Sequence, residues 1–442
     1  MDLRKRKRLI SAFCFFIFVL SLLVVKLWFI QVRDGEEYAV MTLEQVSSYV
    51  ALEEACRGQI LDRNLAPITG EIIEERVVVF PALIDDKDAV LQILSGILET
   101  PREVLTGLIS DIPCYLPLKL SPEQAVAIKE RDLKGVTVLP ICFRYGDRPL
   151  AAQVVGHLGK ISSMDEFALL SGCSKKLYRY GDLVGKSGLE AFYEQELKGI
   201  RPERAVRVFY DAGGNLLNGS VLSVEEDVKD SSRQDLVLTI DARIQSIVED
   251  VMDKEIPNGA VVVMEAGTGD LLAMAGRPAY HPAQVEDYLQ PGEEERFFDR
   301  CTALYPPGSI FKIVVAAAAL EEGVISPENQ FTCNGANEKL IHCWQDVGHG
   351  SITFLQAFAK SCNPVFARVS LSLGAQKIIE YAKRLGLDNQ TVIGYPISPD
   401  RRQDLTLIAA PNNLVNSSVG QGPVLATPVQ VTSMVNAIVN DG

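Results

Sequence analysis

The sequence predicts an α+β protein that is anchored by one N-terminal transmembrane helix. Its 442 residues begin with a basic block and a long apolar run, continue as a mosaic of short strand-like and helical segments, and then show an amphipathic helix followed by a strand hairpin. With 47% hydrophobic and 23% charged residues, the composition is that of a globular protein, not of a disordered or a polytopic membrane protein. The net charge of −14 argues against nucleic-acid binding, which needs surplus Lys and Arg.

The N-terminus carries the pattern of a membrane anchor. Residues 4–8 are all Arg or Lys, and residues 9–32 are largely apolar, with Lys26 near the far end. About 20 apolar residues are enough for a helix to cross the hydrocarbon core. The alternative is a cleaved signal peptide, but the apolar segment is longer than a usual signal core and no small-x-small cleavage site follows it. We therefore expect a cytoplasmic tail over 1–8, a single-pass helix in the cell membrane over 9–32, and the bulk of the chain on the extracytoplasmic side.

Two folded regions are expected after the anchor. Residues 33–230 combine helical stretches with strand-like runs at Glu75–Phe80, Val136–Pro140 and Arg204–Tyr210, which predicts an elongated mixed α/β domain. The charged stretch Glu225–Arg233 is typical of a linker. Residues 235–442 then form the second domain.

The second domain begins with a regular alternation of elements. A strand is expected at Leu236–Ile240, an amphipathic helix at Arg243–Lys254, and two further strands at Ala260–Met264 and Leu271–Ala275. A Gly-containing turn joins the last two strands, so they should form an antiparallel hairpin. A helix followed by a hairpin predicts an antiparallel sheet flanked by helices.

The main chemical signal is the pair Ser309 and Lys312. They stand at the start of the run Ile313–Leu320, which is apolar all round and predicts a buried helix. Residues three apart share one helix face, so the two side chains should be neighbours. Burial and the positive end of the helix dipole both lower the pKa of a lysine, and a neutral Lys312 can take the proton of Ser309 and make it a nucleophile. The alternative is a serine that caps a core helix whose lysine reaches solvent.

A second polar group contains Ser361 and Asn363, and it follows the predicted helix Thr353–Lys360. A serine hydroxyl can relay a proton between Lys312 and an amine, and an asparagine amide can bind a substrate carbonyl. The alternative is a polar turn before Pro364.

The nine cysteines give no pattern that indicates a metal site. There is no Cys-x-x-Cys pair, and we do not expect His342 and His349 to form a metal set. Cys333 and Cys343 bracket a short polar segment that a disulfide could close in an oxidising compartment. The alternative is that all nine are free, mostly buried thiols.

Taken in this order, the two polar motifs resemble those of the penicillin-binding serine acyltransferases. Further segments resemble one branch, the class B penicillin-binding proteins, which are peptidoglycan D,D-transpeptidases with a non-catalytic pedestal. The segments similar to pedestal motifs are Arg57–Asn64, Arg144-Tyr145 with Gly156–Gly159, and Gly185–Glu190. Those similar to the transpeptidase domain are Gly259–Ala275, Tyr305–Lys312, His349-Gly350, and Gly420–Gly422 with Ala426–Pro428. The resemblance covers nearly the whole chain.

This resemblance implies a membrane-anchored D,D-transpeptidase that cross-links peptidoglycan stem peptides. Ser309 would attack the penultimate D-Ala carbonyl, with Lys312 as base, Ser361 as proton relay and Asn363 as a substrate-binding residue. An amine from a neighbouring strand would resolve the acyl-enzyme, and neither a metal nor an organic cofactor is implied. β-Lactams would imitate D-Ala-D-Ala and acylate Ser309. The expected protein partner is a membrane glycan polymerase of the division or elongation machinery.

The family's third motif, Lys-Thr-Gly or a near equivalent, is expected downstream of Ala426–Pro428 and is not found before Gly442. Lys186-Ser187-Gly188 has similar letters but precedes the nucleophile and lies in the pedestal. The resemblance therefore implies a pedestal over 33–230 and a transpeptidase domain over 235–442 that is truncated at its C-terminus. The missing strand would supply an oxyanion-hole donor, whose loss costs about 100- to 1,000-fold in rate.

Two other classes of function stay open from the sequence. One is a D,D-carboxypeptidase or β-lactamase, in which water replaces the acceptor amine. The other is a non-catalytic binding module, either a β-lactam sensor or a scaffold partner of a glycan polymerase.

Overall fold

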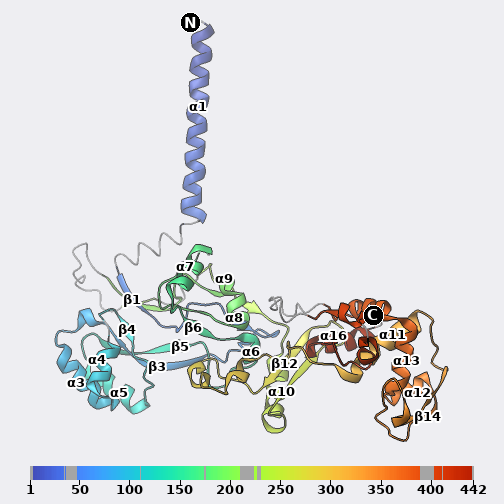
Figure 1. The fold of residues 1–442 in the computed structure, drawn as a ribbon. Coiled ribbons are helices and arrows are strands. Elements are labelled where there is room, and N and C mark those ends of the chain that lie inside the picture. The colour runs from blue at the N-terminus through green and yellow to red at the C-terminus, as the bar shows by residue number, and fades with distance from the viewer. Residues whose placement is uncertain are drawn as a thin grey trace.

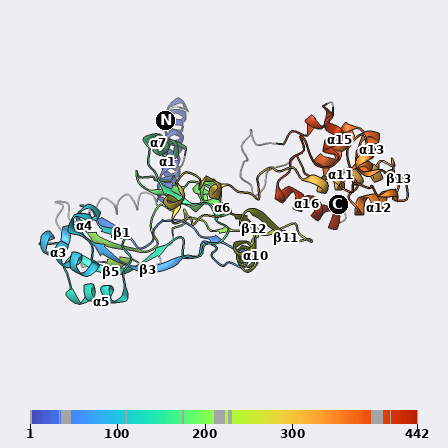
Figure 2. The ribbon, with the colours of Figure 1, turned by 60° about the horizontal axis from the view of Figure 1, so that its bottom comes forward.

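The computed structural model describes residues 3–33, 35, 47–109, 111–173, 176–209, 223–225, 230–388, 403–410 and 412–440. These residues form an N-terminal helix, an elongated mixed α/β region, and a region of helices that contains a strand hairpin (Figure 1). The predicted α+β class is confirmed. Figure 2 shows the helices α3, α4 and α5 at one end of the body and the helices around α11 at the other end.

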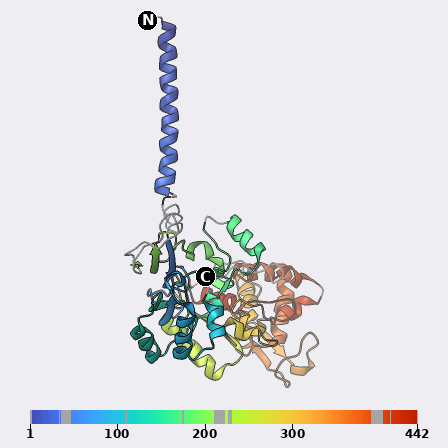
Figure 3. The ribbon, with the colours of Figure 1, turned by 90° about the vertical axis from the view of Figure 1, so that its left-hand side faces the viewer.

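The N-terminal helix α1 (Leu3–Trp28) continues as a π-helical turn, Phe29–Arg33. Its segment Phe13–Val32 has a mean hydropathy of 2.6, and none of it is buried against the rest of the chain. An apolar helix exposed on all sides is stable in lipid, where its backbone groups are satisfied internally. Figures 1 and 3 show α1 standing apart from the folded body. The segment lies within the predicted span 9–32, and its orientation stays a prediction.

A three-stranded antiparallel sheet forms the head of the first region. Strand β3 (Ile72–Val79) lies between β4 (Cys114–Tyr115) and β5 (Val136–Phe143). Side chains alternate across a strand. Val77 and Val79 therefore pack under the helices α3 (Lys87–Leu98), α4 (Arg102–Leu108) and α5 (Pro122–Arg131), whereas Val78 packs into a separate core on the other face. The predicted strands at 75–80 and 136–140 fall in β3 and β5.

The rest of the first region is built from short elements. Strand β8 (Ala205–Phe209) lies between β1 (Ser47–Ala51) and β9 (Ser223–Glu225), and this agrees with the strand predicted at 204–210. Strands β6 (Leu158–Lys160) and β7 (Leu183–Gly185) form a second antiparallel pair. The connecting helices are α6 (Ala152–Val155), α7 (Met164–Cys173), α8 (Gly188–Phe192) and α9 (Glu194–Leu197).

A buried ionic network joins the three segments that resemble pedestal motifs. The carboxylate of Glu190 is fully buried. It accepts hydrogen bonds from Arg57 Nε at 3.0 Å and Tyr145 OH at 3.0 Å, and also from Arg144 Nε. Arg57 Nη1 also donates to Glu194 at 2.6 Å. Because each buried charge has an opposite partner, the network holds residues that are far apart in sequence in one arrangement.

The two regions are joined by shared structure. Strand β2 (Ile60–Leu61) pairs in parallel with β10 (Leu236–Val237). The buried carboxylate of Asp62 accepts from the backbone N–H of Ala66 at 2.8 Å and of Ala242 at 3.1 Å. A buried apolar cluster combines residues of both regions, among them Ile60, Val154, Leu189, Ile240, Met274 and Val429. The second region is therefore packed directly on the first.

Only the two ends of the predicted linker 225–233 are described: Glu225 ends strand β9, and residues 230–233 are packed against the first region. Asp230 is 4% exposed and accepts from the backbone N–H of Ile200 at 2.7 Å. Arg233 donates to both carboxylate oxygens of Glu53, at 3.0 and 2.9 Å. A charged composition indicated a solvated linker, but the side chains of Asp230 and Arg233 are 0% and 8% exposed and are hydrogen-bonded, so residues 230–233 belong to the folded first region.

The second region opens as the sequence predicts. Helix α10 (Ala242–Glu255) precedes β11 (Gly259–Met264) and β12 (Leu271–Arg277), which form the antiparallel hairpin. Helix α16 (Pro428–Val439) packs on β11. The strand predicted at 236–240 is shorter, since only β10 pairs there.

A lobe of helices, here called the helical lobe, makes up the rest of this region. Its central helix α11 (Lys312–Glu321) follows the 3₁₀ turn η5 (Gly308–Phe311). Val314, Val315 and Ala318 on α11 are fully buried. Helices α13 (Asn363–Leu373) and α14 (Ala375–Arg384) pack on α11, and α12 (Phe354–Ala359) and α15 (Asn413–Ser417) pack on α13. The antiparallel strands β13 (Gln330–Cys333) and β14 (Gly350–Thr353) lie beside α13 and α12. The predicted buried helix is confirmed.

Candidate active site

Ser309 lies at the start of the central helix of the lobe. It belongs to η5, and its side chain is exposed. Lys312 begins α11 one turn later, and it is only 2% exposed. Pro306 and Pro307 stiffen the approach to this turn. The segment therefore presents a hydroxyl to solvent directly above a buried amine.

Four polar groups surround the amine of Lys312. Its Nζ lies 3.2 Å from Ser309 Oγ and 2.9 Å from Ser361 Oγ. It also donates to the backbone carbonyl of Ser361 at 2.8 Å and to Asn363 Oδ1 at 2.7 Å. All four site residues expected from the sequence are thus in direct contact around one nitrogen atom.

Burial lowers the pKa of Lys312 to about 8, and the neighbouring thiols of Cys362 and Cys343 oppose this only in part. A lysine with that pKa is neutral in about a tenth of molecules at pH 7. The neutral amine has a lone pair and can accept the proton of Ser309 across the observed contact. The site can therefore generate a serine nucleophile near neutral pH.

Ser361 is held in an unusual backbone conformation. Its φ is 53°, in the left-handed region that residues with a side chain rarely adopt. The next residue, Cys362, is the N-cap of α13, and Asn363 is the first helical residue. This turn directs the carbonyl and hydroxyl of Ser361 and the side chain of Asn363 to the same amine. A strained backbone conformation of this kind persists only where contacts with the surrounding structure hold the residue in it.

The segment before Ser309 is supported from the C-terminal part of the chain. Tyr305 and Ala426 exchange two backbone hydrogen bonds of 2.9 Å each, and Gly308 N–H donates to the carbonyl of Gly420 at 2.9 Å. Gly420 has φ +70°, and a Cβ atom placed on it would lie 1.9 Å from the carbonyl oxygen of Gly308. Only glycine fits there. The two segments 420–422 and 426–428 therefore fix the position of the nucleophile turn.

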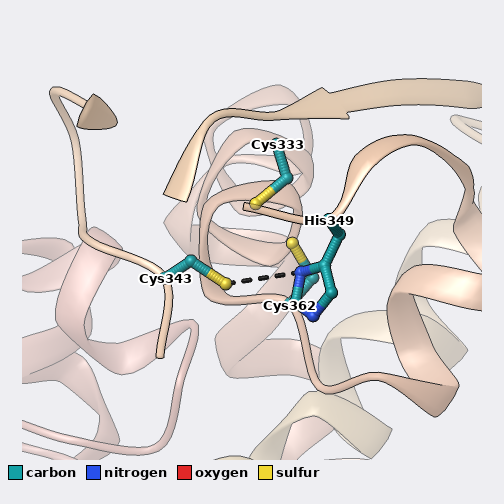
Figure 4. A group of neighbouring side chains, drawn as sticks. All are labelled: Cys333, Cys343, His349 and Cys362. Atoms are coloured by element: carbon teal, nitrogen blue, oxygen red, sulfur yellow. Dashed lines mark hydrogen bonds between the residues drawn. The ribbon is translucent and has the colours of Figure 1, made fainter. Parts of the chain in front are cut away.

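A group of four possible metal ligands lies next to this site. Cys333, Cys343, His349 and Cys362 place one ligand atom each within 4.8 Å of one another. All three cysteines are buried, and Figure 4 shows their sulfur atoms and the imidazole ring converging on one point. Cys343 Sγ and His349 Nδ1 are in contact at 3.4 Å. The chemistry of these donors fits a zinc ion.

This group was not predicted from the sequence, which indicated no metal set. The four residues are separated by irregular intervals, so no close-spaced motif marks them. Cys333 and Cys343, which the sequence offers as a disulfide pair, are both free thiols in the structure. The available signal was three cysteines and a histidine within one short stretch that ends inside the Ser361–Asn363 motif.

The comparisons with known proteins agree with this architecture. Residues 52–238 match the family described as Penicillin-binding Protein dimerisation domain, and residues 259–442 match the family described as Penicillin binding protein transpeptidase domain. The chain belongs to the class B penicillin-binding proteins. In this chain the dimerisation domain precedes the transpeptidase domain.

Similar curated proteins cover the chain almost from end to end. It is 30% identical over 458 residues to Stage V sporulation protein D of Bacillus subtilis (strain 168). That alignment covers 99% of this chain and 65% of the relative. It is 24% identical over 468 residues to the peptidoglycan D,D-transpeptidase MrdA of Escherichia coli (strain K12), with 99% and 72% covered. The chain thus spans about two thirds to three quarters of the length of these relatives.

Solved structures share the fold. The penicillin-binding protein PBP2 from Helicobacter pylori has a TM-score of 0.64 at 22% identity, over 89% of this chain and 77% of that one. A chain of the structure titled "Structural coordination of polymerization and crosslinking by a peptidoglycan synthase complex" has a TM-score of 0.68 at 24% identity, over 98% and 77%.

Proposed function

We propose that the chain is a membrane-anchored peptidoglycan D,D-transpeptidase that works through a serine acyl-enzyme. The observation that carries this is the convergence of Ser309, Ser361 and Asn363 on the buried amine of Lys312. The family to which the chain belongs and its similarity to the peptidoglycan D,D-transpeptidase MrdA support the substrate class. We assign residues 33–230 to the pedestal and 235–442 to the transpeptidase domain.

Acylation starts at the contact between Ser309 and Lys312. The neutral Nζ takes the hydroxyl proton as the serine oxygen bonds to the carbonyl carbon of the penultimate D-Ala of a stem peptide. Ser361 then gives its hydroxyl proton to the departing D-Ala nitrogen and recovers a proton from Lys312, 2.9 Å away. The C–N bond breaks, D-Ala leaves, and the peptide remains as an ester on Ser309.

Deacylation runs the same relay in reverse. The amine of a second stem peptide attacks the ester carbonyl and loses its proton through Ser361 to Lys312. Lys312 returns a proton to Ser309 as the ester bond breaks, which restores the resting enzyme. Asn363 Oδ1 accepts from Lys312, and its Nδ2 donates to the backbone carbonyl of His342 at 3.5 Å. The second proton on Nδ2 is the one that we assign to the substrate carbonyl.

Penicillins are expected to enter the first half of this cycle only. Their strained amide is attacked by Ser309 in place of the D-Ala-D-Ala bond, and the opened ring stays attached to the ester. A non-catalytic scaffold would have no need of a buried lysine whose pKa burial lowers to about 8, since desolvating the ammonium ion costs stability. The site thus favours an enzyme over the scaffold.

We also propose that the chain works beside a membrane glycan polymerase, with residues 1–8 in the cytoplasm and the body outside the membrane. The exposed apolar segment Phe13–Val32 supports a single-pass anchor. A solved structure of the same fold carries a title that names polymerization and crosslinking in one complex. The basic residues 4–8 support the orientation.

The full chain in detergent, incubated with a stem pentapeptide ending in D-Ala-D-Ala and a soluble amine, tests the proposal. We expect release of D-Ala together with the amine-linked product, as measured by mass spectrometry. Ser309→Ala should abolish both, whereas Ser372→Ala, an exposed serine on α13, should leave both unchanged. A product hydrolysed by water alone would indicate a carboxypeptidase. D-Ala release that persists in Ser309→Ala would overturn the assignment of the nucleophile.

A further inference from the structure

A cavity, here called the seam cavity, lies where the first region meets the second. Its volume is about 370 Å³. One wall is formed by residues 147–149, between β5 and α6, and the others by α10, by the end of β12 with the residues that follow it, and by the 3₁₀ turn η4 (Glu294–Phe297). Figures 1 and 2 show α10 and β12 in the middle of the body and α11 in the helical lobe at one end. The seam cavity is therefore not part of the site around Lys312.

Hydrogen bonds across the seam hold the walls of the cavity in place. The backbone N–H of Ala151 donates to Glu249 Oε1 at 2.7 Å. The side chain of Gln153, which is 9% exposed, donates to the carbonyls of Pro278 and Arg296 at 3.1 Å each. Because both regions contribute to these bonds, the cavity has a fixed shape. A preformed site of this kind binds a ligand without first having to be ordered.

The charged side chains around the seam cavity compensate one another. Three are acidic and three are basic: Asp147, Glu249, Asp253, Arg148, Arg277 and Arg296. Arg277, which is 7% exposed, donates to Asp253 at 2.6 Å and to Glu249 at 3.2 Å. A charged ligand would lose its hydration here without gaining a net attraction, whereas an uncharged polar ligand loses much less. The lining therefore favours a ligand without charge.

His281 adds no charge to this lining. Its Nε2 lies 3.0 Å from the carbonyl oxygen of Gly146, and its Nδ1 accepts from the backbone N–H of Ala283 at 3.2 Å. Since a carbonyl oxygen can only accept, Nε2 carries the hydrogen and Nδ1 has none. These two bonds select the uncharged form of the ring.

The rest of the lining suits a sugar. Pro149, Pro257 and Pro278 offer apolar surface on which the C–H groups of a sugar ring can be buried. Among the residues that the structure describes, Oδ2 of Asp253 has no hydrogen-bond partner, and this side chain is 59% exposed, so it can accept from a hydroxyl group. The volume is at the lower end of the range of about 300–1,000 Å³ that is usual for ligand sites, which suits a short stretch of an oligosaccharide.

We propose that the seam cavity binds an uncharged oligosaccharide of acetamido sugars, the kind of chain that carries the stem peptides in peptidoglycan. The cavity holds this chain on the body while Ser309, in the helical lobe, acts on a stem peptide attached to it. Holding the chain raises the local concentration of its stem peptides at the serine. This role rests on the proposed function, whereas binding of the sugar chain does not.

Binding of chitotetraose, an uncharged tetramer of N-acetylglucosamine, tests the site itself. The full chain is kept in a detergent without a sugar headgroup, and binding is measured by saturation-transfer NMR. We expect a dissociation constant of about 0.1–10 mM, since a site of this size buries few ligand atoms. The deacetylated tetramer is cationic and should bind at least about 10-fold more weakly, because the acidic side chains are already paired. Absence of chitotetraose binding, or tighter binding of the cationic tetramer, would overturn the proposal.

Variants connect the sugar to the seam cavity. Ala279→Trp places a large side chain in the lining and should weaken binding at least about 10-fold, because the indole and the sugar cannot share the space. Ala283→Trp is the matched control, since Ala283 is exposed on the same segment and does not line the cavity. Asp253→Leu, at a largely exposed side chain, provides a second variant that does not fill the cavity, and loss of the acceptor should weaken binding about 5-fold. Wild-type affinity in both Ala279→Trp and Asp253→Leu would contradict the assignment.

Turnover separates the seam cavity from the proposed function. Ser309→Ala should bind chitotetraose as the wild type does, so loss of catalysis does not contradict the sugar site. A stem pentapeptide attached to a short glycan should release D-Ala at least about 10-fold faster, at low concentration, than the free pentapeptide does. Ala279→Trp should lose most of this preference, and Ala283→Trp should keep it. Equal rates for the two substrates in the wild type would refute the role in holding substrate, whereas no release from either would refute the proposed function.

Discussion

The amine of Lys312 lies 2.7 Å from the side-chain oxygen of Asn363, a residue 51 positions further along the chain. The contact joins the first turn of α11 to the first turn of α13. It places a buried amine where both the nucleophile and the second serine can reach it. The acid–base behaviour of this amine is therefore the property on which the chemistry depends.

The rate of penicillin acylation should rise with pH and level off above about 8. Burial lowers the pKa of Lys312 to about 8, and only the neutral amine can take the proton of Ser309. Below that pKa each pH unit should raise the rate about tenfold. Stopped-flow or quenched labelling of the full chain over a pH series measures this. A rate that is flat with pH would contradict a lysine base.

Lys312→Arg is the sharper variant for the same group. The guanidinium stays protonated at any pH in the series, so it keeps the charge and loses the base. Labelling should fall by about 100- to 10,000-fold, the range for loss of a positioned base. Lys377→Arg, an exposed lysine on α14, is the control and should keep the wild-type rate. Comparable rates in both variants would contradict the assigned role.

The same pKa shift has a consequence for stability. The pKa of Lys312 is lower in the folded chain than the ordinary value of 10.5, so the unfolded chain binds more protons between about pH 8 and 10.5. The cost of burying the ammonium ion is present in full below that window and is relieved as pH rises through it. The free energy of unfolding of the wild type, relative to Lys312→Met, should therefore increase from pH 8 to 10. A constant difference would argue against a lowered pKa.

Gly420→Ala should disable the nucleophile turn without unfolding the chain. The new methyl group would meet the carbonyl oxygen of Gly308, one residue before Ser309, at 1.9 Å. Acylation should fall at least about 10-fold, because the hydroxyl leaves its position over Lys312. Gly323→Ala is the matched control, since Gly323 has a similar φ of +64° and no atom within 4 Å of the new Cβ. Equal effects in both variants would trace the loss to backbone strain and not to the contact with Gly308.

Glu190→Gln should destabilise the first region strongly. In the wild type, the carboxylate of Glu190 contacts the buried guanidinium groups of both Arg57 and Arg144, and the substitution removes its negative charge. Removing one partner of a buried ion pair costs about 3–5 kcal/mol in the free energy of unfolding. Glu166→Gln removes a partly exposed pair with Lys186 and should cost less than about 1 kcal/mol. Denaturant unfolding of both variants decides this, and a small loss for Glu190→Gln would contradict a structural role of the network.

The sequence predicted local structure well where one element decides it. The spacing of Ser309 and Lys312 and the apolar run after them predicted the buried helix and the contact between the two side chains. Strand β3 was expected from its Val-rich run, and the hairpin of β11 and β12 from its turn. In each case the pattern lies within one element or two neighbouring ones.

What could not be predicted depends on how distant segments fold onto one another. The charges at Asp230 and Arg233 indicated a solvated linker, yet both side chains are largely buried, where backbone N–H groups and Glu53 are their hydrogen-bond partners. The meeting of the three cysteines with His349 depends on the close backbone contacts of Gly335 and Gly348. No periodicity in the sequence encodes such contacts.

The most direct test of the account is to locate the bond that penicillin forms. The full chain is incubated with benzylpenicillin, digested, and its peptides are sequenced by mass spectrometry. We predict one penicilloyl group, carried by Ser309, whose formation is lost in Ser309→Ala and slowed in Lys312→Arg. An adduct on Ser361 or on another serine, or no adduct on a folded and reduced chain, would contradict the central claim.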